Sequence, residues 1–348
     1  MTAPATRILV VGPAWIGDMV MAGSLTRLLA ARGHTVDVVA PPWPYALLDR
    51  LAGVSQAHRL EVGHHEMALR ARLKLARELR ALGYAQAIVL PRSAKAALLP
   101  WLARIPRRTG LRGEFRYGLI NDMRSIEWTR AKPMIERFCA LGLEPAEALP
   151  ESLPQPVLAV DAEARRATMA RLGLEGGRPV AACMPGAEHG TAKRWPYFAE
   201  LARRLRAEGF DVWLLGGPRD AAEGEAIVAG SGNTAVNLCG RTTLPEAADL
   251  LGGVDVAISN DSGLLHVAAA TGAPIVGLYG SSTPAYTPPL SDRREILYLA
   301  LECSPCFARE CPLGHFRCLR DMTVDAVLDA ALRLANGRAE SRAAAPER

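Results

Sequence analysis

The sequence predicts an α/β protein made of two doubly wound domains, and three observations support this prediction. Short apolar segments typical of buried strands alternate with amphipathic helical segments. Because this alternation occurs twice along the 348 residues, each half predicts a parallel sheet with helices on both faces. Between the halves, residues 144–156 contain four prolines, which is typical of a linker. We therefore predict domains at 1–150 and 151–335, followed by a flexible tail at 336–348.

The first half contains three apolar segments that we interpret as buried strands, at 7–13, 35–41 and 86–91. A helix is expected at about 19–31, and Gly33 would end it in a left-handed conformation. A basic amphipathic pattern predicts another helix at 66–82.

The second half repeats the alternation. Its strands are expected at 178–185, 210–218, 234–240, 255–261 and 273–280. Its helices are expected at 197–208, 221–229, 245–251, 262–272 and 324–335. Two such domains joined by a linker form a cleft, and doubly wound sheets bind ligands at the carboxyl ends of their strands. The functional residues are therefore expected at those ends.

Composition excludes several classes of protein. Hydrophobic residues make up 49% and charged residues 22%, which argues against a disordered chain. The 31 glycines and 25 prolines are scattered, which argues against a collagen-like one. No apolar segment approaches the roughly 20 residues that span a bilayer, and no signal peptide is recognisable. We expect a soluble, cytoplasmic protein.

The net charge of +5 is unevenly distributed. Residues 1–150 carry 21 Lys and Arg against 12 Asp and Glu, whereas the remainder carries 20 against 24. The basic residues are densest at 92–116, where seven cations accompany one acid. Such a segment is either a solvated surface or a site for an anionic partner. Its aromatic residues are not spaced like a stacking platform, so no nucleic-acid partner is expected.

Four of the seven cysteines form a cluster around His315. They are Cys303, Cys306, Cys311 and Cys318. In a cytoplasmic protein this arrangement indicates a metal more readily than disulfides, although the spacing fits no standard zinc motif closely. Two interpretations stay open: a structural zinc site, and reduced thiols in a packed loop.

The segment GPAWIGDMV follows the first strand and places Asp18 where a helix begins. An acid there can stabilise the helix start, and a carboxylate at the end of a strand is also well placed as a general base. The glycine spacing departs from the dinucleotide fingerprint G-x-G-x-x-G, so a nicotinamide dehydrogenase is not supported.

Two later segments predict a site for phosphate. PGAEHGTAKRWP contains Thr191 and Lys193 in a glycine-containing loop, where backbone N–H groups, a hydroxyl and an ammonium can surround an anion. Its Glu188 and His189 could be catalytic, although polar loop residues more often satisfy the turn.

The segment SNDSGLLHVAAATGAP starts a helix after a strand, and a phosphate binds readily at such a helix start. The candidate residues there are Asp261, Ser262, Gly263 and His266. For His266, a hydrogen-bonded position in the core is as good an interpretation as a role in phosphate binding.

A fourth segment, LLGGPRD, ends a strand at Gly216. An acid at such an edge can bind ribose hydroxyls, and Asp220 and Glu223 both remain candidates.

In this order and spacing, four segments resemble the ADP-heptose lipopolysaccharide heptosyltransferases of glycosyltransferase family 9, over most of residues 7–335. They are GPAWIGDMVMAGSL, LPRSAKAALLPWLARIPRRTGLRGEFRYGLIND, PGAEHGTAKRWP and NDSGLLHVAAATGAPIVGLYG. The resemblance implies a GT-B fold, in which two Rossmann-like domains face a central cleft. It implies inverting transfer of L-glycero-D-manno-heptose from ADP-heptose to the first heptose of the inner core, on phosphorylated Kdo2-lipid A. It implies no metal or other cofactor for the chemistry.

The resemblance also implies roles for the candidate residues. Asp18 matches the general base and Lys193 a phosphate contact, and the segment from Asp261 to His266 matches the nucleotide-diphosphate motif. The acceptor would meet the N-terminal domain at the cytoplasmic face of the inner membrane. The expected acceptor residues are Gly17, Arg92, Lys95, Arg108, Arg112 and Arg116.

Two other hypotheses remain. One is a GT-B transferase with another nucleotide sugar or another acceptor, such as the enzyme that adds the first heptose. The other is a non-catalytic protein of two domains that closes on a nucleotide.

Overall fold

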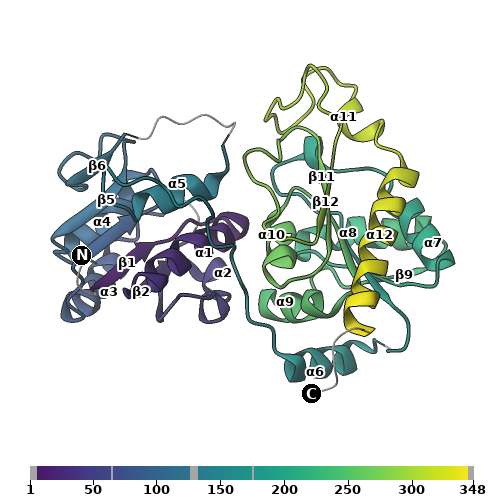
Figure 1. The fold of residues 1–348 in the computed structure, drawn as a ribbon, viewed down its shortest axis with the longest axis horizontal. Helices are drawn as coiled ribbons and strands as arrows, with labels where there is room; N and C mark the ends of the chain where they lie inside the picture. Colours follow the sequence, from purple (N-terminus) through teal and green to yellow (C-terminus); the bar gives the residue numbers. More distant parts are fainter. Residues whose placement is uncertain (1–5, 64–65, 126–131, 175, 344–348) are drawn as a thin grey trace. The chain divides into compact units, whose positions relative to one another are not determined.

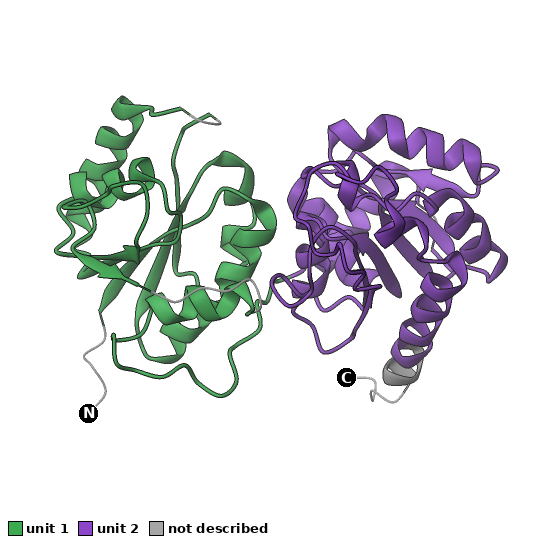
Figure 2. Cartoon of the chain, turned by 90° about the horizontal axis from the view of Figure 1, so that it is seen from above, with its two compact units in different colours: residues 1–159 green, residues 160–348 purple. Residues whose placement is uncertain are grey.

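The computed structural model describes residues 6–63, 66–125, 132–174 and 176–343 (Figure 1). The chain divides into two compact units, Met1–Ala159 and Val160–Arg348 (Figure 2). Each unit contains a six-stranded parallel sheet within its described residues.

The sheet of the first unit has the strand order β3-β2-β1-β4-β5-β6. The strands are β1 (Arg7–Val11), β2 (Thr35–Ala40), β3 (Gln56–Arg59), β4 (Gln86–Val89), β5 (Arg107–Leu111) and β6 (Asp122–Arg124). The helices are α1 (Ile16–Ala31), α2 (Pro42–Tyr45), α3 (Leu69–Ala81), α4 (Ala94–Leu102) and α5 (Met134–Leu141). Leu9 and Val11 of the central strand pack with Leu75 and Leu79 of α3 and Leu99 of α4. Burial on both faces explains why β1 is apolar after Arg7.

The sheet of the second unit has the order β12-β11-β10-β7-β8-β9. The strands are β7 (Val180–Met184), β8 (Asp211–Leu214), β9 (Ala235–Asn237), β10 (Val256–Asn260), β11 (Ile275–Tyr279) and β12 (Arg294–Tyr298). The helices are α6 (Ala162–Leu172), α7 (Phe198–Ala207), α8 (Ala221–Gly230), α9 (Leu244–Gly253), α10 (Gly263–Ala270), α11 (Arg317–Arg320) and α12 (Val324–Ala343). On one face the core packs Phe198 and Leu201 of α7 and Val327 of α12 against β7 and β10. Both units therefore have the doubly wound α/β fold that the sequence predicts.

The boundary between the units lies nine residues beyond the predicted one, because the end of the proline-rich segment is held by the first unit. The N–H of Ala52 donates to the carbonyl of Val157 at 2.9 Å, and the N–H of Ala159 donates to that of Arg50 at 2.8 Å. An antiparallel bridge joins Leu51 to Leu158 between these bonds.

The prediction of a tail from residue 336 is wrong for 336–343, because α12 continues to Ala343. The guanidinium of Arg338 is buried and donates to the carbonyl of Gly252 at 3.0 Å and to that of Val254. These carbonyls lie at the end of α9, so the bonds fix the last turns of α12 to the unit. The rest of the predicted tail, 344–348, lies outside the described residues. No helix in the described part of the chain is long and apolar enough to cross a membrane.

Candidate active site

The strand order of each sheet reverses beside its first strand, and doubly wound folds bind ligands at this reversal. It lies between β1 and β4 in the first unit and between β7 and β10 in the second. The carboxyl ends of β1, β7 and β10 lead into the segments that carry Asp18, Lys193 and Asp261. The second unit thus brings Lys193 and Asp261, which are 68 residues apart, to one edge of its sheet.

Asp18 is the third residue of α1, directly after the loop that follows β1. Gly12 lets that loop lie close to the helix, since a Cβ at this position would be 2.3 Å from Cε of Met19. Gly17 is buried and Asp18 is half-buried. The helix dipole stabilises a carboxylate in the first turn. Both predicted roles of Asp18, a helix-start acid and a general base, are compatible with this position.

Lys193 and Asp261 form an ion pair at the carboxyl edge of the second sheet. The ammonium of Lys193 lies 2.5 Å from Oδ2 of Asp261. The hydroxyl of Ser282, which follows β11, donates to the same oxygen at 2.5 Å. Asp261 is 6% exposed, so its charge is balanced within the protein rather than by water. Ser282 was not predicted from the sequence, although it also follows a strand at the ligand-binding edge.

The start of α10 adds polar groups beside this pair. Ser262 occupies the N-cap position, and its side chain makes no capping hydrogen bond. His266 lies in the first turns of α10, with Nε2 4.0 Å from Oδ1 of Asp261. Burial, together with the charge of Lys193, lowers the pKa of His266 to about 4, so the ring is neutral at neutral pH. Its Nδ1 is buried and has no hydrogen-bond partner among the described residues.

The segment with Lys193 is attached to β10 through Asn260, which the sequence did not indicate as a site residue. Nδ2 of Asn260 donates to the carbonyl of Pro185 at 2.6 Å. Its Oδ1 accepts the N–H of Trp195 at 3.1 Å. The buried indole of Trp195 donates to the carbonyl of Met322 at 2.9 Å. Asn260 therefore links both ends of the loop between β7 and α7, while Thr191 within it stays exposed.

The two candidate ribose acids share one cation at the end of β8. Arg194 pairs with Glu223 and lies 3.5 Å from Oδ1 of Asp220. The other oxygen of Asp220 accepts the N–H of Gly217 at 2.9 Å. Gly216 lets this loop close around Asp220, because a Cβ at Gly216 would lie 2.9 Å from that of Asp220. Burial raises the pKa of Glu223. The geometry leaves both acids as candidates.

The cysteine loop, residues 301–318, packs directly against the segment that carries Lys193. The N–H of Ala192 donates to the carbonyl of Arg309 at 3.0 Å. The N–H of Phe307 donates to the carbonyl of Ser281 at 2.7 Å, next to Ser282. The backbone of Gly190, at φ +142°, runs so close that a Cβ there would lie 2.3 Å from the oxygen of Arg309. The loop therefore fixes the positions of the Lys193 segment and of the segment that follows β11.

Substituting Gly190→Ala is expected to displace the Lys193 segment, since the new Cβ cannot coexist with the Arg309 carbonyl. We expect the KM for the nucleotide donor that the resemblance implies to rise roughly tenfold or more, because displacements of about an ångström are costly in active sites. Steady-state kinetics with a varied donor measure this change. Gly209→Ala is the matched control, since Gly209 also has a positive φ but nothing within 4 Å of its Cβ position. Equal donor KM values for the two variants would contradict the prediction.

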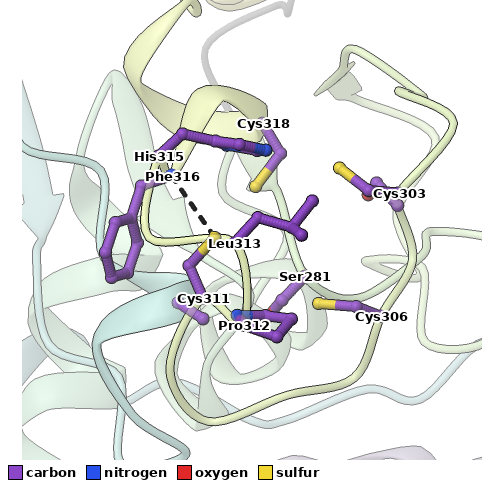
Figure 3. Close-up of a pocket in the computed structure, with 11 residues that line it drawn as sticks. Ser281, Cys303, Cys306, Cys311, Pro312, Leu313, His315, Phe316 and Cys318 are labelled. Atoms are coloured by element: carbon purple, nitrogen blue, oxygen red, sulfur yellow. Dashed lines mark hydrogen bonds between the residues drawn. The ribbon is translucent and has the colours of Figure 1, made fainter.

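All four clustered cysteines line one small pocket of about 20 Å³, together with Ala192 and Ser281 (Figure 3). The N–H of Phe316 donates to Sγ of Cys311 at 3.4 Å and lowers the pKa of that thiol. Nevertheless, no group of three or more Cys, His, Asp or Glu side chains among the described residues could hold a metal ion. The choice between a structural zinc site and reduced thiols in a packed loop stays a prediction from the sequence.

Three predicted acceptor residues of the basic segment lie at the carboxyl edge of the first sheet. Arg92 follows β4, Lys95 is in the first turn of α4, and Arg112 follows β5. Arg92 and Arg112 are exposed, and Nε of Arg92 donates to the carbonyl of Arg112 at 3.2 Å. Glu114 accepts the N–H of Ala94 and thereby caps α4.

The acceptor roles predicted for Arg108 and Arg116 are wrong, because both guanidinium groups bind backbone carbonyls. Arg116 is 1% exposed and donates to the carbonyls of Leu111 at 2.5 Å and Pro91 at 2.6 Å. Burial lowers the pKa of Arg116 to about 10, which leaves it charged at neutral pH. Arg108 lies near the amino end of β5, away from the carboxyl edge of the sheet, and donates to the carbonyls of Ile105, Pro106, Gly118 and Leu119.

Substituting Arg116→Met is expected to lower the free energy of unfolding by about 3 kcal/mol, because it leaves buried carbonyls without donors. Urea denaturation measures this loss. The exposed Arg112→Met is the matched control and should change stability by less than about 0.5 kcal/mol. An Arg116→Met variant as stable as the Arg112→Met variant would contradict the structural role.

The fold and the site together define a glycosyltransferase of the GT-B class, with one Rossmann-like unit for each half of the chain. The chain belongs to glycosyltransferase family 9 (heptosyltransferase), whose model matches residues 72–317. The resemblance predicted from the motifs is thereby confirmed. The placement of the two units around a cleft stays a prediction.

The similarity extends over nearly the whole chain. The chain is 40% identical to lipopolysaccharide heptosyltransferase 2 of Escherichia coli K12, over 93% of this chain and 97% of the relative. It is also 40% identical to lipooligosaccharide heptosyltransferase 2 of Haemophilus influenzae, over 84% of this chain and 88% of the relative. The solved structure of the E. coli ADP-heptose lipopolysaccharide heptosyltransferase II superposes with a TM-score of 0.83 and 39% identity, covering 96% of this chain and 99% of that one.

Proposed function

We propose that this enzyme transfers L-glycero-D-manno-heptose from ADP-heptose to the first heptose of the lipopolysaccharide inner core, on phosphorylated Kdo2-lipid A. The proposal follows from the family and from the similarity to heptosyltransferases 2. The acceptor would bind the first unit and the nucleotide sugar the second. Neither a metal nor another cofactor is proposed for the chemistry.

The observation that supports a diphosphate donor most directly is the contact between Lys193 and Asp261 beside the start of α10. An ammonium and the N–H groups of a helix start both bind phosphate oxygens. Next to them, Nδ1 of the neutral His266 is a buried polar atom without a partner in the described chain. Asp261 would hold the ammonium of Lys193 in place until the diphosphate binds and pairs with that ammonium as well.

In the proposed mechanism, Asp18 accepts the proton of the acceptor hydroxyl while that oxygen attacks the anomeric carbon. The bond from this carbon to ADP breaks on the opposite side, so the configuration inverts and the electron pair leaves with ADP. A carboxylate is a weak base for an alcohol, because an alcohol is far less acidic than a carboxylic acid. Proton transfer must therefore be late, when the sugar is already oxocarbenium-like and the hydroxyl is acidified.

Charge stabilisation would come from the second unit. The leaving ADP gathers negative charge, and Lys193 with the start of α10 would stabilise it. On the first unit, Arg92, Lys95 and Arg112 would bind the phosphates and carboxylates of the acceptor, with Gly17 beside the base. Such an acceptor is anchored in a membrane, so the enzyme would act as a peripheral protein at the cytoplasmic face of the inner membrane.

Incubation of the purified protein with ADP-heptose and heptosyl-Kdo2-lipid A tests the proposal, with product mass as the readout. Kdo2-lipid A without heptose is the control for the acceptor, and UDP- and GDP-sugars are the controls for the donor. Transfer to Kdo2-lipid A alone would indicate the enzyme for the first heptose. ADP binding without transfer to either acceptor would indicate a non-catalytic binding protein.

A further inference from the structure

The first unit has a second charged surface, which begins at the edge of the sheet opposite Asp18. It contains a hollow of about 520 Å³ lined by Arg80, Trp101, Leu102, Arg104 and Arg108. These residues end α3 and α4 or begin β5. In parallel α/β folds the helices run antiparallel to the strands, so helix ends lie at the amino edge. No acid lines the hollow, and the active-site residues lie at the other edge.

Two arginines of this hollow have their positions fixed by the backbone. The guanidinium of Arg108 binds four carbonyls, as described above, and Arg80 donates to the carbonyl of Leu102 at 2.7 Å. Arg104 follows the end of α4 with φ +58° and is exposed. Its side chain pairs with no carboxylate in the part of the chain that the structure describes. The hollow therefore carries positive charge that no described acid neutralises.

The surface continues along α3 and combines charge with apolar groups. Its exposed side carries the cations Arg70, Lys74 and Arg77, spaced so that they share one face of the helix, and one acid, Glu78. At its start, Met67 and Leu69 are 55% and 52% exposed. Near the end of α4, the side chain of Trp101 is 47% exposed.

This combination distinguishes a lipid surface from a soluble anion. A site for a small anion needs no exposed methionine, leucine or tryptophan around it. Helices that lie on membranes carry cations together with Trp, Leu and Met, because the apolar groups enter the headgroup region while the cations meet lipid phosphates. Tryptophan in particular concentrates at the bilayer interface.

We propose that the α3 surface, comprising the exposed side of α3 with the Arg80–Trp101–Arg104 hollow, docks the protein on an anionic phospholipid bilayer. Trp101 enters the headgroup region, and Arg80 and Arg104 bind lipid phosphates. The proposal rests on the proposed function, which requires a lipid-linked acceptor. This docking surface is separate from Arg92, Lys95 and Arg112, whose proposed role is to bind the acceptor.

Sedimentation of the full chain with phosphatidylcholine vesicles, with and without phosphatidylglycerol, tests this surface. The wild-type protein should bind only the anionic vesicles, and less as salt is raised. Arg104→Glu should weaken binding roughly tenfold, since it replaces a cation at the bilayer by an anion. Trp101→Ala should weaken binding without changing the salt dependence. The matched control is Arg203→Glu, on the exposed side of α7 in the second unit, and it should bind like the wild type.

Three outcomes would overturn the docking surface: no binding to anionic vesicles, equal losses for Arg104→Glu and Arg203→Glu, or an unchanged Arg104→Glu variant. A deacylated acceptor in solution separates this test from that of the proposed function. Arg104→Glu should turn over the soluble acceptor at the wild-type rate. If the wild-type protein binds vesicles but turns over neither acceptor, the proposed function is wrong. The docking surface would then no longer serve to bring the enzyme to a lipid-linked acceptor.

Discussion

Substituting Asp18→Asn is expected to lower kcat by roughly 10²–10⁴-fold, which is the typical contribution of a general base. The amide keeps the shape of the side chain and removes the group that accepts the proton. ADP affinity should stay nearly unchanged, because the proposed nucleotide residues are in the second unit. Single-turnover rates with saturating ADP-heptose and acceptor, together with calorimetric titration of ADP, measure the two effects.

The competing role of Asp18 is to stabilise the start of α1, and Glu136 provides the control. Glu136 is likewise the third residue of its helix, α5, and is also half-buried in the first unit. An acid in this position stabilises a helix by about 0.3–1 kcal/mol. Glu136→Gln should therefore cost stability without slowing turnover. If Asp18→Asn keeps turnover within about tenfold of the wild type, Asp18 is not the base.

Most of the strands that could be predicted from sequence are buried on both faces, although the edge strand β9 was predicted as well. Residues 8–11 of β1 and 256–258 of β10 are continuous apolar segments, whereas the edge strands β3 (QAHR) and β6 (DMR) have no such pattern. α4 was missed because it contains Pro100, which ordinarily argues against a helix. α6 did carry a signal, since Asp161 accepts the N–H groups of Glu163 and Ala164 as an N-cap.

The same limit applies to the candidate site. Motif order was enough to indicate Lys193 and Asp261, because both follow buried strands. Lys193, Asp261 and Ser282 lie in three different loops. Their contacts depend on how these loops come together, and no local sequence pattern predicts that. The basic segment could not be divided from sequence, since no local pattern distinguishes an arginine that binds carbonyls from one that faces solvent. Arg116 and Arg112 differ only in how the loop after β5 folds back.

Substituting Lys193→Ala is expected to weaken ADP binding roughly 10- to 100-fold, which corresponds to the loss of about 1.5–3 kcal/mol for a hydrogen bond to a charged group. The rate should fall as well, because the leaving diphosphate gains charge in the transition state that Lys193 would stabilise. Calorimetry with ADP and single-turnover rates measure the two losses separately. Lys95→Ala is the matched control, since Lys95 is a half-buried lysine assigned to the acceptor. It should raise the KM for the acceptor and leave ADP affinity intact.

The alternative role of Lys193 is to neutralise the buried Asp261, without touching the nucleotide. Removing it would then leave Asp261 with the hydroxyl of Ser282 as its polar contact on Oδ2, and an uncompensated buried charge destabilises a fold. Thermal unfolding of the ADP-free variant detects this cost in either case. What separates the two roles is affinity measured well below the unfolding temperature. A Lys193→Ala protein that is less stable but binds ADP like the wild type would assign Lys193 to the fold and remove it from the donor site.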